Sequence, residues 1–345
     1  MFKKLLQLAL LILVGMGLPS LAFAATLDWD GDIDSEWNTA ANYIDELLLV
    51  NPASPPTAAD RVEVDDAVGN TPDIGLGDVA VAGEVRIGRN EGAGLLTISG
   101  GSLTTSLNRF RVGAADAGGP QGTFVMTAGT LTVNNASFVT GSSSKGHVIM
   151  SGGTISIPGG GFDFNMDENT PTAASILDMS GGRIEVNDVF LVDQTATVNL
   201  SGGAIVTTSS GGALRIRRDS VVNITGGLLE TKDDLELGSG ATAGGTVNLD
   251  GGVLRAFRLN GAPGPTGIVN INGGKLQFLN SQETETEVAG YITSGYFATS
   301  FPSLFVNTVD VDGLLYTQVC AVPEPATMFL FLLGGVGAML ARPRI

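Results

Sequence analysis

The amino-acid sequence predicts an all-β protein, a parallel β-helix (β-solenoid) of about eight to nine coils with a cap at each end. Three observations predict this fold: glycine pairs recur at intervals of 21 to 29 residues, apolar residues keep fixed positions around each pair, and 49 of 345 residues are glycine while only 6% are aromatic. A unit of this length cannot bury its own apolar face, so neighbouring units must stack to form a continuous core.

The glycine pairs are expected to form corners. Apolar residues stand five and three residues before, and two residues after, the second glycine of every copy, as Val198, Leu200 and Ile205 do around Gly203. Residues two apart lie on one face of a strand, but the five-residue step from Leu200 to Ile205 would reverse the face, so the chain must bend between them. Glycine tolerates the positive φ of such a bend. The second glycines are Gly101, Gly129, Gly153, Gly182, Gly203, Gly227, Gly252 and Gly274, and at Gly129 alanine (Ala128) takes the place of the first glycine.

A third apolar doublet in most copies predicts three short strands per coil. Helical repeats are excluded because a glycine pair in every unit costs a helix about 1 kcal/mol per glycine. The predicted doublets are Phe110 and Val112, Phe162 and Phe164, Phe190 and Val192, Leu214 and Ile216, Leu235 and Leu237, and Phe257 and Leu259.

Four asparagines occupy one repeat position in successive coils: Asn199, Asn223, Asn248 and Asn270. They are either a ligand-binding array or a stacking ladder. We favour the ladder, because identical amides in stacked coils lie about 4.8 Å apart and can bond to one another along the axis.

The first 24 residues are expected to be a signal peptide. Lys3 and Lys4 provide the charge, residues 5–18 the apolar run, and Ala22 and Ala24 the small residues that precede a cleavage site. The apolar run is shorter than the roughly 20 residues that a spanning helix needs. The mature protein is expected to begin at Ala25.

Residues 322–345 have three parts in a fixed order. Val322, Pro323, Glu324 and Pro325 precede an apolar stretch expected to form a helix, and Arg342 and Arg344 lie near the end. This segment resembles the PEP-CTERM sorting tail. The resemblance implies an exosortase-type sorting enzyme as partner, transient anchoring in a membrane, a secreted or cell-surface location and association with exopolysaccharide in biofilm. An ordinary C-terminal membrane anchor is the alternative, and basic residues on the cytoplasmic side fit either interpretation.

Residues 25–60 are expected to cap the N-terminal end of a solenoid that spans residues 61–280. Trp29, Trp37 and Tyr43 belong to a segment that is similar to the first residues of the autotransporter-associated β-strand repeat proteins. We expect these three side chains to pack the cap rather than to stack on sugars. Residues 281–321 have strand-like composition without glycine pairs and are expected to form the C-terminal cap.

Charge and cysteine content limit the possible functions. The formal net charge is −17, and it becomes −20 without the two end segments, which carry four of the bases and one of the acids. Such a surface repels nucleic acid. The single cysteine, Cys320, excludes an internal disulfide.

No cofactor or metal is assigned. The single histidine, His147, is expected in a loop or at an edge, without the further ligands of a zinc site. Asp28, Asp30, Asp32 and Asp34 alternate in the cap, but an EF-hand that started at Asp28 would need glycine and glutamate where Ile33 and Thr39 stand.

The leading interpretation is a structural or adhesive protein of the cell exterior, not an enzyme. The alternative is a β-helix polysaccharide hydrolase or lyase, since paired carboxylates or clustered arginines can flank a glycosidic bond. The candidate residues for that chemistry are Asp163, Asp167 and Glu168, then Asp233, Asp234 and Glu236, and then Arg215, Arg217, Arg218 and Asp219.

Overall fold

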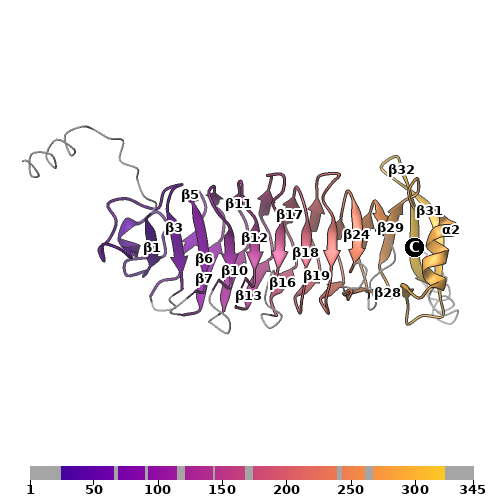
Figure 1. The fold of residues 1–345 in the computed structure, drawn as a ribbon. Coiled ribbons are helices and arrows are strands. Elements are labelled where there is room, and N and C mark those ends of the chain that lie inside the picture. Colours follow the sequence, from indigo (N-terminus) through magenta and orange to yellow (C-terminus); the bar gives the residue numbers. More distant parts are fainter. Residues whose placement is uncertain are drawn as a thin grey trace, which may run out of the picture.

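The computed structural model is an elongated parallel β-solenoid of about nine turns, with 49% of its residues in strands and 4% in helices. Figure 1 shows the strands stacked along the rod from the N-terminal end to the C-terminal end. The structure describes residues 25–65, 69–89, 92–114, 121–142, 144–167, 174–238, 243–260 and 267–322. The predicted fold class is therefore confirmed.

Three sheets run along the rod, and almost every coil gives one strand to each of them. Sheet A contains β2 (Tyr43–Asp45), β1 (Thr26–Trp29), β3 (Arg61–Val64), β6 (Glu84–Ile87), β9 (Phe110–Val112), β12 (Phe138–Thr140), β15 (Phe164–Met166), β18 (Phe190–Val192), β21 (Leu214–Ile216), β24 (Asp234–Leu237) and β27 (Arg258–Leu259). Sheet B contains β4 (Asp73–Ile74), β7 (Gly94–Ile98), β10 (Gly122–Met126), β13 (Gly146–Met150), β16 (Ile176–Met179), β19 (Thr197–Leu200), β22 (Val221–Ile224), β25 (Thr246–Leu249), β28 (Ile268–Ile271) and β30 (Phe297–Ala298). Sheet C contains β5 (Val79–Ala82), β8 (Ser102–Thr105), β11 (Thr130–Val133), β14 (Thr154–Ile157), β17 (Arg183–Val186), β20 (Ala204–Thr207), β23 (Leu228–Glu230), β26 (Val253–Ala256), β29 (Lys275–Leu279), β32 (Leu314–Val322) and β31 (Ser303–Val311).

The apolar positions of the repeat form the core, as predicted. The residues five and three before each second glycine are the inward residues of sheet B, and the residue two after it is an inward residue of sheet C. Val198, Leu200 and Ile205 are at most 1% exposed, and the same holds for their counterparts in the other coils. Parallel pairing in register places each of these side chains directly over its counterpart in the next coil.

Four phenylalanines stack along sheet A inside the rod. Phe110, Phe138, Phe164 and Phe190 are fully buried, with successive ring centroids 4.9, 4.5 and 5.0 Å apart and ring planes within 22° of each other. Two predicted doublets are wrong here. The inward pair of β15 is Phe164 and Met166, because Phe164 aligns with Phe138, and Phe162 is only half-buried. Phe257 is also half-buried, outside the short strand β27.

At the corner between β19 and β20 both glycines are needed, for different reasons, whereas the corner at Gly129 has Ala128 at its first position. Gly203 has φ +79°, as the bend requires. Gly202 lies so close to the preceding corner that a Cβ atom there would come within 2.4 Å of the Ser180 carbonyl oxygen. The sequence predicts the first requirement, whereas the second comes from the stacking of one corner on the next.

The N-terminal cap packs around three aromatic side chains, as predicted. Tyr43 contacts Trp29 and Trp37 edge to face, at centroid distances of 5.0 and 6.1 Å, and its hydroxyl donates to the Trp37 carbonyl oxygen at 2.7 Å. All three side chains are at most 2% exposed, so they close the core and present no ring to a sugar. The short 3-10 helix η1 (Ala40–Asn42) and the antiparallel pair β1–β2 complete the cap.

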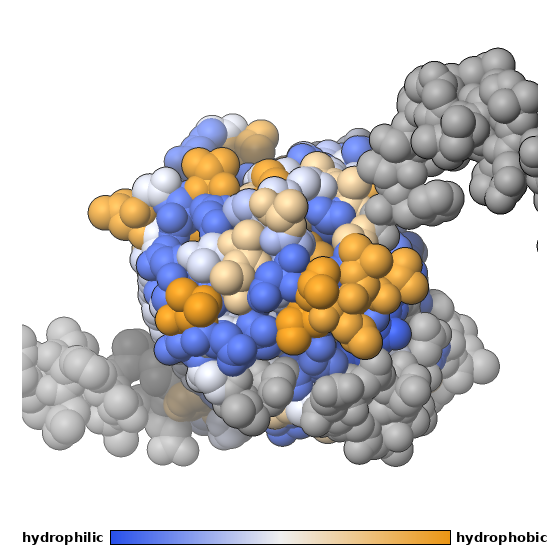
Figure 2. Space-filling model, turned by 90° about the vertical axis from the view of Figure 1, so that its left-hand side faces the viewer, coloured by the Kyte–Doolittle hydropathy of each residue, from blue (hydrophilic) through white to orange (hydrophobic). Residues whose placement is uncertain are grey.

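An apolar turn projects from the same cap. Leu47, Leu48, Leu49 and Val50 are all more than half exposed, and Figure 2 shows apolar residues grouped on this end of the rod. The Asp45 carboxylate accepts from the backbone N–H groups of Leu47 and Leu48 at 2.9 and 3.0 Å, which fixes the turn. The aliphatic side chains are therefore held in solvent by a local hydrogen-bonded framework.

The C-terminal cap differs from its prediction. The strand-like composition of residues 281–321 includes Tyr291, but this residue lies in the helix α2 (Glu285–Thr293), which is followed by the antiparallel hairpin β31–β32. The helix begins with a capping box in which Thr284 and Glu287 each bond the backbone N–H of the other. The Thr-x-x-Glu spacing is visible in the sequence and could have identified the helix start.

Candidate functional site

A column of polar side chains runs along the outer face of sheet B. Asn270 donates to Asn248 at 2.9 Å, Asn248 to Asn223 at 2.8 Å, and Asn223 to Asn199 at 2.8 Å, in each case from Nδ2 to Oδ1. The predicted amide ladder is confirmed. It continues one coil further, because Asn199 donates to Oδ1 of Asp178 at 2.7 Å. We call Asp178, Asn199, Asn223, Asn248 and Asn270 the amide column.

Asp178 was missed by the sequence analysis, although it stands four residues before Gly182, just as Asn199 stands four residues before Gly203. Its second carboxylate oxygen lies 2.8 Å from Nε2 of His147, which is on the outer face of the central strand β13. The expectation of a loop or edge position for His147 is therefore wrong: its ring is held over sheet B, where the amide column ends.

The amide column leaves bonding capacity for a ligand. Asn199, Asn223 and Asn248 each use one amide hydrogen and one oxygen lone pair in the ladder and retain a second of each, and Asn270 uses only one amide hydrogen. The side chains are half-buried, so this remaining capacity faces the surface. On one side lies a parallel column of small and β-branched residues, namely Thr197, Val221, Thr246 and Ile268. The face therefore offers one amide and one apolar or hydroxyl contact per coil.

The charged residues of sheet A near the N-terminal end bind one another. Glu84 is 3% exposed and lies 2.9, 2.8 and 3.4 Å from Arg61, Arg86 and Arg111. Burial alone would raise the pKa of Glu84, but the hydrogen bonds from Arg86 and Arg61 outweigh it and lower that pKa. Glu84 is therefore held as a carboxylate and is unsuited to act as a general acid.

The arginines that were candidates for a hydrolase or lyase site also form ion pairs. Arg215 and Arg217 both bind Glu236, at 3.2 and 2.7 Å. Arg218 lies 3.5 Å from Asp193, and its neighbour Asp219 has φ +61° in the same turn. Arg215 and Arg217 therefore bind Glu236 of strand β24, and Arg218 binds Asp193, the residue after strand β18.

The carboxylates proposed with them are distributed over separate contacts. Asp234 binds Arg258 through both oxygens, at 2.7 and 3.3 Å, and the pKa of Asp233 is raised, by burial first and then by Asp234. Asp163 accepts from the Val189 N–H at 3.1 Å. Glu168 lies outside the described residues.

Asp167 is fully buried and accepts from the Ser175 N–H at 3.1 Å. Burial raises its pKa to about 6. A side chain without exposed surface cannot reach a polysaccharide, so a structural role at this corner follows for Asp167.

The four alternating aspartates of the N-terminal cap do not converge on one point. Asp34 accepts from Asn42 and from the Glu36 N–H, at 2.6 and 2.9 Å, and these bonds lower its pKa. Asp30 accepts from the Asp32 N–H at 3.3 Å. Within the described part of the chain, no group of three or more histidine, cysteine, aspartate or glutamate side chains is arranged to hold a metal ion.

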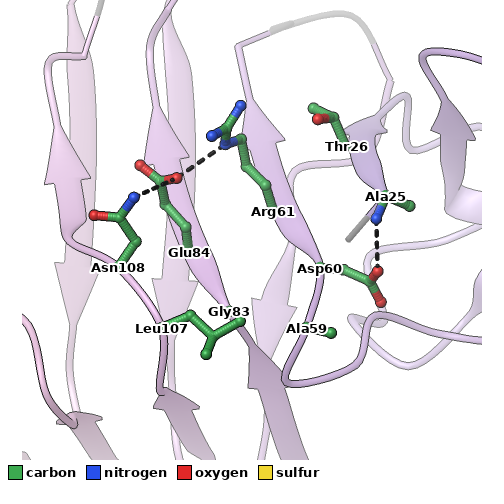
Figure 3. A pocket seen from close by; sticks show the side chains of 9 residues that line it. All are labelled: Ala25, Thr26, Ala59, Asp60, Arg61, Gly83, Glu84, Leu107 and Asn108. Carbon is green, nitrogen blue, oxygen red and sulfur yellow. Dashed lines mark hydrogen bonds and ion pairs between the residues drawn. The ribbon is translucent and has the colours of Figure 1, made fainter. Parts of the chain in front are cut away.

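A cavity of about 260 Å³ opens beside the first strand (Figure 3). Asp60 and Glu84 point into this region from opposite sides, and each already has partners: the Ala25 backbone N–H for Asp60, and Arg61 for Glu84. No sequence pattern pointed to this site, because Arg61 and Glu84 are 23 residues apart and meet only when their coils stack. The lining residues are Ala25, Thr26, Ala59, Asp60, Arg61, Gly83, Glu84, Leu107 and Asn108.

Most of the predicted processing residues fall outside the described part of the chain, namely Ala22, Ala24, Pro323, Glu324, Pro325, Arg342 and Arg344. Val322 ends strand β32, and Ala25 immediately precedes β1. Cys320 is a free cysteine within β32, in register with Lys275 and Phe305.

In the described ranges no helix has the length and apolar character needed to cross a bilayer. No protein-family model, curated protein or solved structure matches this chain.

Proposed function

We propose that this chain is an exported structural or adhesive protein, sorted to the cell surface by an exosortase-type enzyme and associated with extracellular polysaccharide of a biofilm matrix. The N-terminal signal and the C-terminal tail support export and sorting. The β-solenoid supports the structural part, since a stack of coils bonded along its whole length makes a stiff rod with repeated outer surfaces.

The single observation that carries the adhesive part is the amide column. It repeats the same hydrogen-bonding group at one position per coil, from Asn199 to Asn270. A polymer with repeated hydroxyl groups can make one weak contact per coil, and several contacts on a rigid rod add their free energies without a deep pocket. The strongly acidic surface favours neutral over acidic polysaccharides.

Affinity electrophoresis in gels that contain neutral or acidic polysaccharides tests this binding. The exported protein should be retarded by at least one neutral polysaccharide, and an Asn223→Ala, Asn248→Ala variant should be retarded less. The matched control is Thr130→Ala, Thr132→Ala on the outer face of sheet C. If both variants are folded by circular dichroism and are retarded equally, the amide column does not bind the polysaccharide.

Cell fractionation tests the sorting. A chain that ends at Val322 should be exported but lost from the surface fraction, whereas the full chain should remain on the surface in cells with an intact exosortase. Retention of the full chain in the membrane, with and without the exosortase, would instead support an ordinary anchor.

Release of reducing sugar tests the enzymatic alternative. We expect no turnover on neutral or acidic polysaccharides, because Glu236 is paired with Arg215 and Arg217, and Asp167 is fully buried. Turnover that disappears in the Glu236→Gln variant would establish a hydrolase or lyase instead.

A further inference from the structure

The backbone nitrogen of Ala25 is held by a side-chain carboxylate. It donates to Oδ1 of Asp60 at 3.0 Å, from a position one residue before strand β1 (Figure 3). The carbonyl oxygen of Ala25 accepts from the Arg61 N–H at 2.9 Å, so both sides of this residue are fixed. Strand β1 itself lies between β2 and β3.

The Asp60 carboxylate is oriented by its own turn. Its second oxygen accepts from the N–H and the hydroxyl of Thr57, at 2.8 and 2.6 Å, and the Asp60 N–H donates to the Thr57 carbonyl oxygen at 3.0 Å. Glu84, the other carboxylate of the cavity, is engaged by Arg61 at 2.9 Å. Asp60 is thus the carboxylate of this site that is aimed at Ala25.

We propose that Asp60 is the binding site for the α-ammonium group of the mature N-terminus, which forms when a signal peptidase cuts the bond between Ala24 and Ala25. This inference rests on the proposed export. In the cut, the C–N bond between Ala24 and Ala25 breaks. The hydroxyl of a water molecule goes to the Ala24 carbonyl carbon, and its remaining proton goes to the Ala25 nitrogen. The resulting carboxylic acid then gives up its proton, and the amine takes one up to become an ammonium group.

Cleavage changes the character of the Ala25–Asp60 contact. Before it, a neutral amide donates to a carboxylate. That bond is already charge-assisted, because its acceptor is ionised. Afterwards a cation donates, so a direct attraction between two opposite charges is added to the hydrogen bond. The new terminus also gains two further N–H donors beside the cavity. Removal of the signal peptide therefore strengthens the attachment of β1, the strand that starts sheet A.

The α-amine pKa of the exported protein measures this pairing. A carboxylate partner favours the charged amine, so its pKa should lie above the ordinary range of about 7.7–8.0. The stability from the pair is then full below that range and is lost as the pH rises through the raised pKa. Pulse labelling with an amine-reactive reagent across pH 6 to 10, read by mass spectrometry of the N-terminal peptide, gives the titration.

The Asp60→Asn variant should return the α-amine pKa to the ordinary range. It should also melt a few degrees lower than the wild type at pH 7 and by a smaller margin at pH 10. Asp78→Asn is the matched control, because Asp78 likewise accepts from a turn N–H, that of Gly75 at 2.8 Å, with no chain terminus beside it.

N-terminal sequencing of the exported protein separates the two ideas. A first residue other than Ala25 would overturn the capture and the assigned cut, and an intact leader would count against export itself. If Ala25 is the first residue and Asp60→Asn does not change the α-amine pKa, export is supported but binding of the N-terminus by Asp60 is contradicted.

Discussion

His147 binds the carboxylate that terminates the amide column: its Nε2 lies 2.8 Å from one oxygen of Asp178, whose other oxygen accepts from Asn199 at 2.7 Å. A single chain of side-chain hydrogen bonds thus links six consecutive coils, from β13 to β28, on the outside of the rod. Backbone pairing and side-chain pairing run along the same axis, so a change in one coil affects its neighbours.

Substitution of Asn223 should interrupt this chain. Asn223→Ala removes one bond to Asn199 and one from Asn248, each with a net value of about 1 kcal/mol. Asn223→Asp should destabilise more, since a carboxylate cannot donate to Asn199 and would face its oxygen. Denaturant unfolding checks the order, with Thr246→Ala on the adjacent column as control. Equal stability of Asn223→Asp and wild type would contradict the donor direction.

Alanine at the corner glycines should destabilise the stack. Gly202→Ala brings a Cβ within 2.4 Å of the Ser180 oxygen, and Gly203→Ala must adopt φ +79°. Each change should cost about 1–3 kcal/mol by thermal or chemical unfolding. Gly211→Ala is the control, because its added Cβ would meet only Ser209 Oγ, at 4.0 Å. A neutral Gly202→Ala would show that the corners can separate without loss.

Truncation of Phe164 should create a cavity in the middle of the aromatic stack. The Phe138 and Phe164 rings are 4.5 Å apart and within 7° of parallel. Phe164→Ala should cost about 3–5 kcal/mol, the usual cost of a fully buried phenylalanine. Phe305→Ala, at a side chain that is 52% exposed, should cost less than about 1 kcal/mol. Calorimetry distinguishes them, and similar losses at both sites would contradict the assigned core.

Protonation of Asp28 should link the stability of the N-terminal cap to pH. Burial first, and then the neighbouring Asp65, Glu46 and Glu63, raise the pKa of Asp28 from 3.8 to about 8. The folded protein holds this proton more tightly than the unfolded chain does. Its contribution to stability is therefore complete below about pH 4 and is lost as the pH rises toward 8.

The Asp28→Asn variant should consequently lose less stability than the wild type between pH 5 and pH 8. Arg89 binds Glu63 and also attracts Glu46 and Asp65, the acidic neighbours of Asp28, so it offsets part of their negative charge. Melting curves across this range provide the measurement, with the exposed Asp32 replaced by asparagine as control. Parallel curves for wild type and Asp28→Asn would contradict a protonated Asp28.

The sequence was sufficient for the repeat and insufficient for contacts between coils. Val198 and Leu200 follow a two-residue period, and the five-residue step to Ile205 requires a bend, so the coils, the corners and the amide ladder could be predicted. The need for glycine at position 202 could not, because Ser180 and Gly202 are distant in sequence and meet only when the corners stack. The same holds for Asp60 and Ala25, which are 35 residues apart.

The errors arose where composition was used without position. Tyr291 and Ile292 suit a strand, but the capping box at Thr284 and the absence of a glycine corner favour the helix α2. Phe162 and Phe164 satisfy the two-residue period as well as Phe164 and Met166 do, and only the alignment of Phe164 with Phe138 decides between them. His147 was assigned to a loop or edge although it precedes the inward residue Val148, and the alternation of strand β13 places it on the outer face beside Asp178.

The in-register pairing of successive coils makes the length of the rod adjustable in whole steps. Val221 lies opposite Thr197, which in turn lies opposite Ile176. Excision of residues 197–220 would therefore set Val221 beside Ile176 and Asn223 beside Asp178, with every inward side chain still facing a counterpart. Gain or loss of one coil changes the reach of the molecule by about 4.8 Å and requires no new kind of contact.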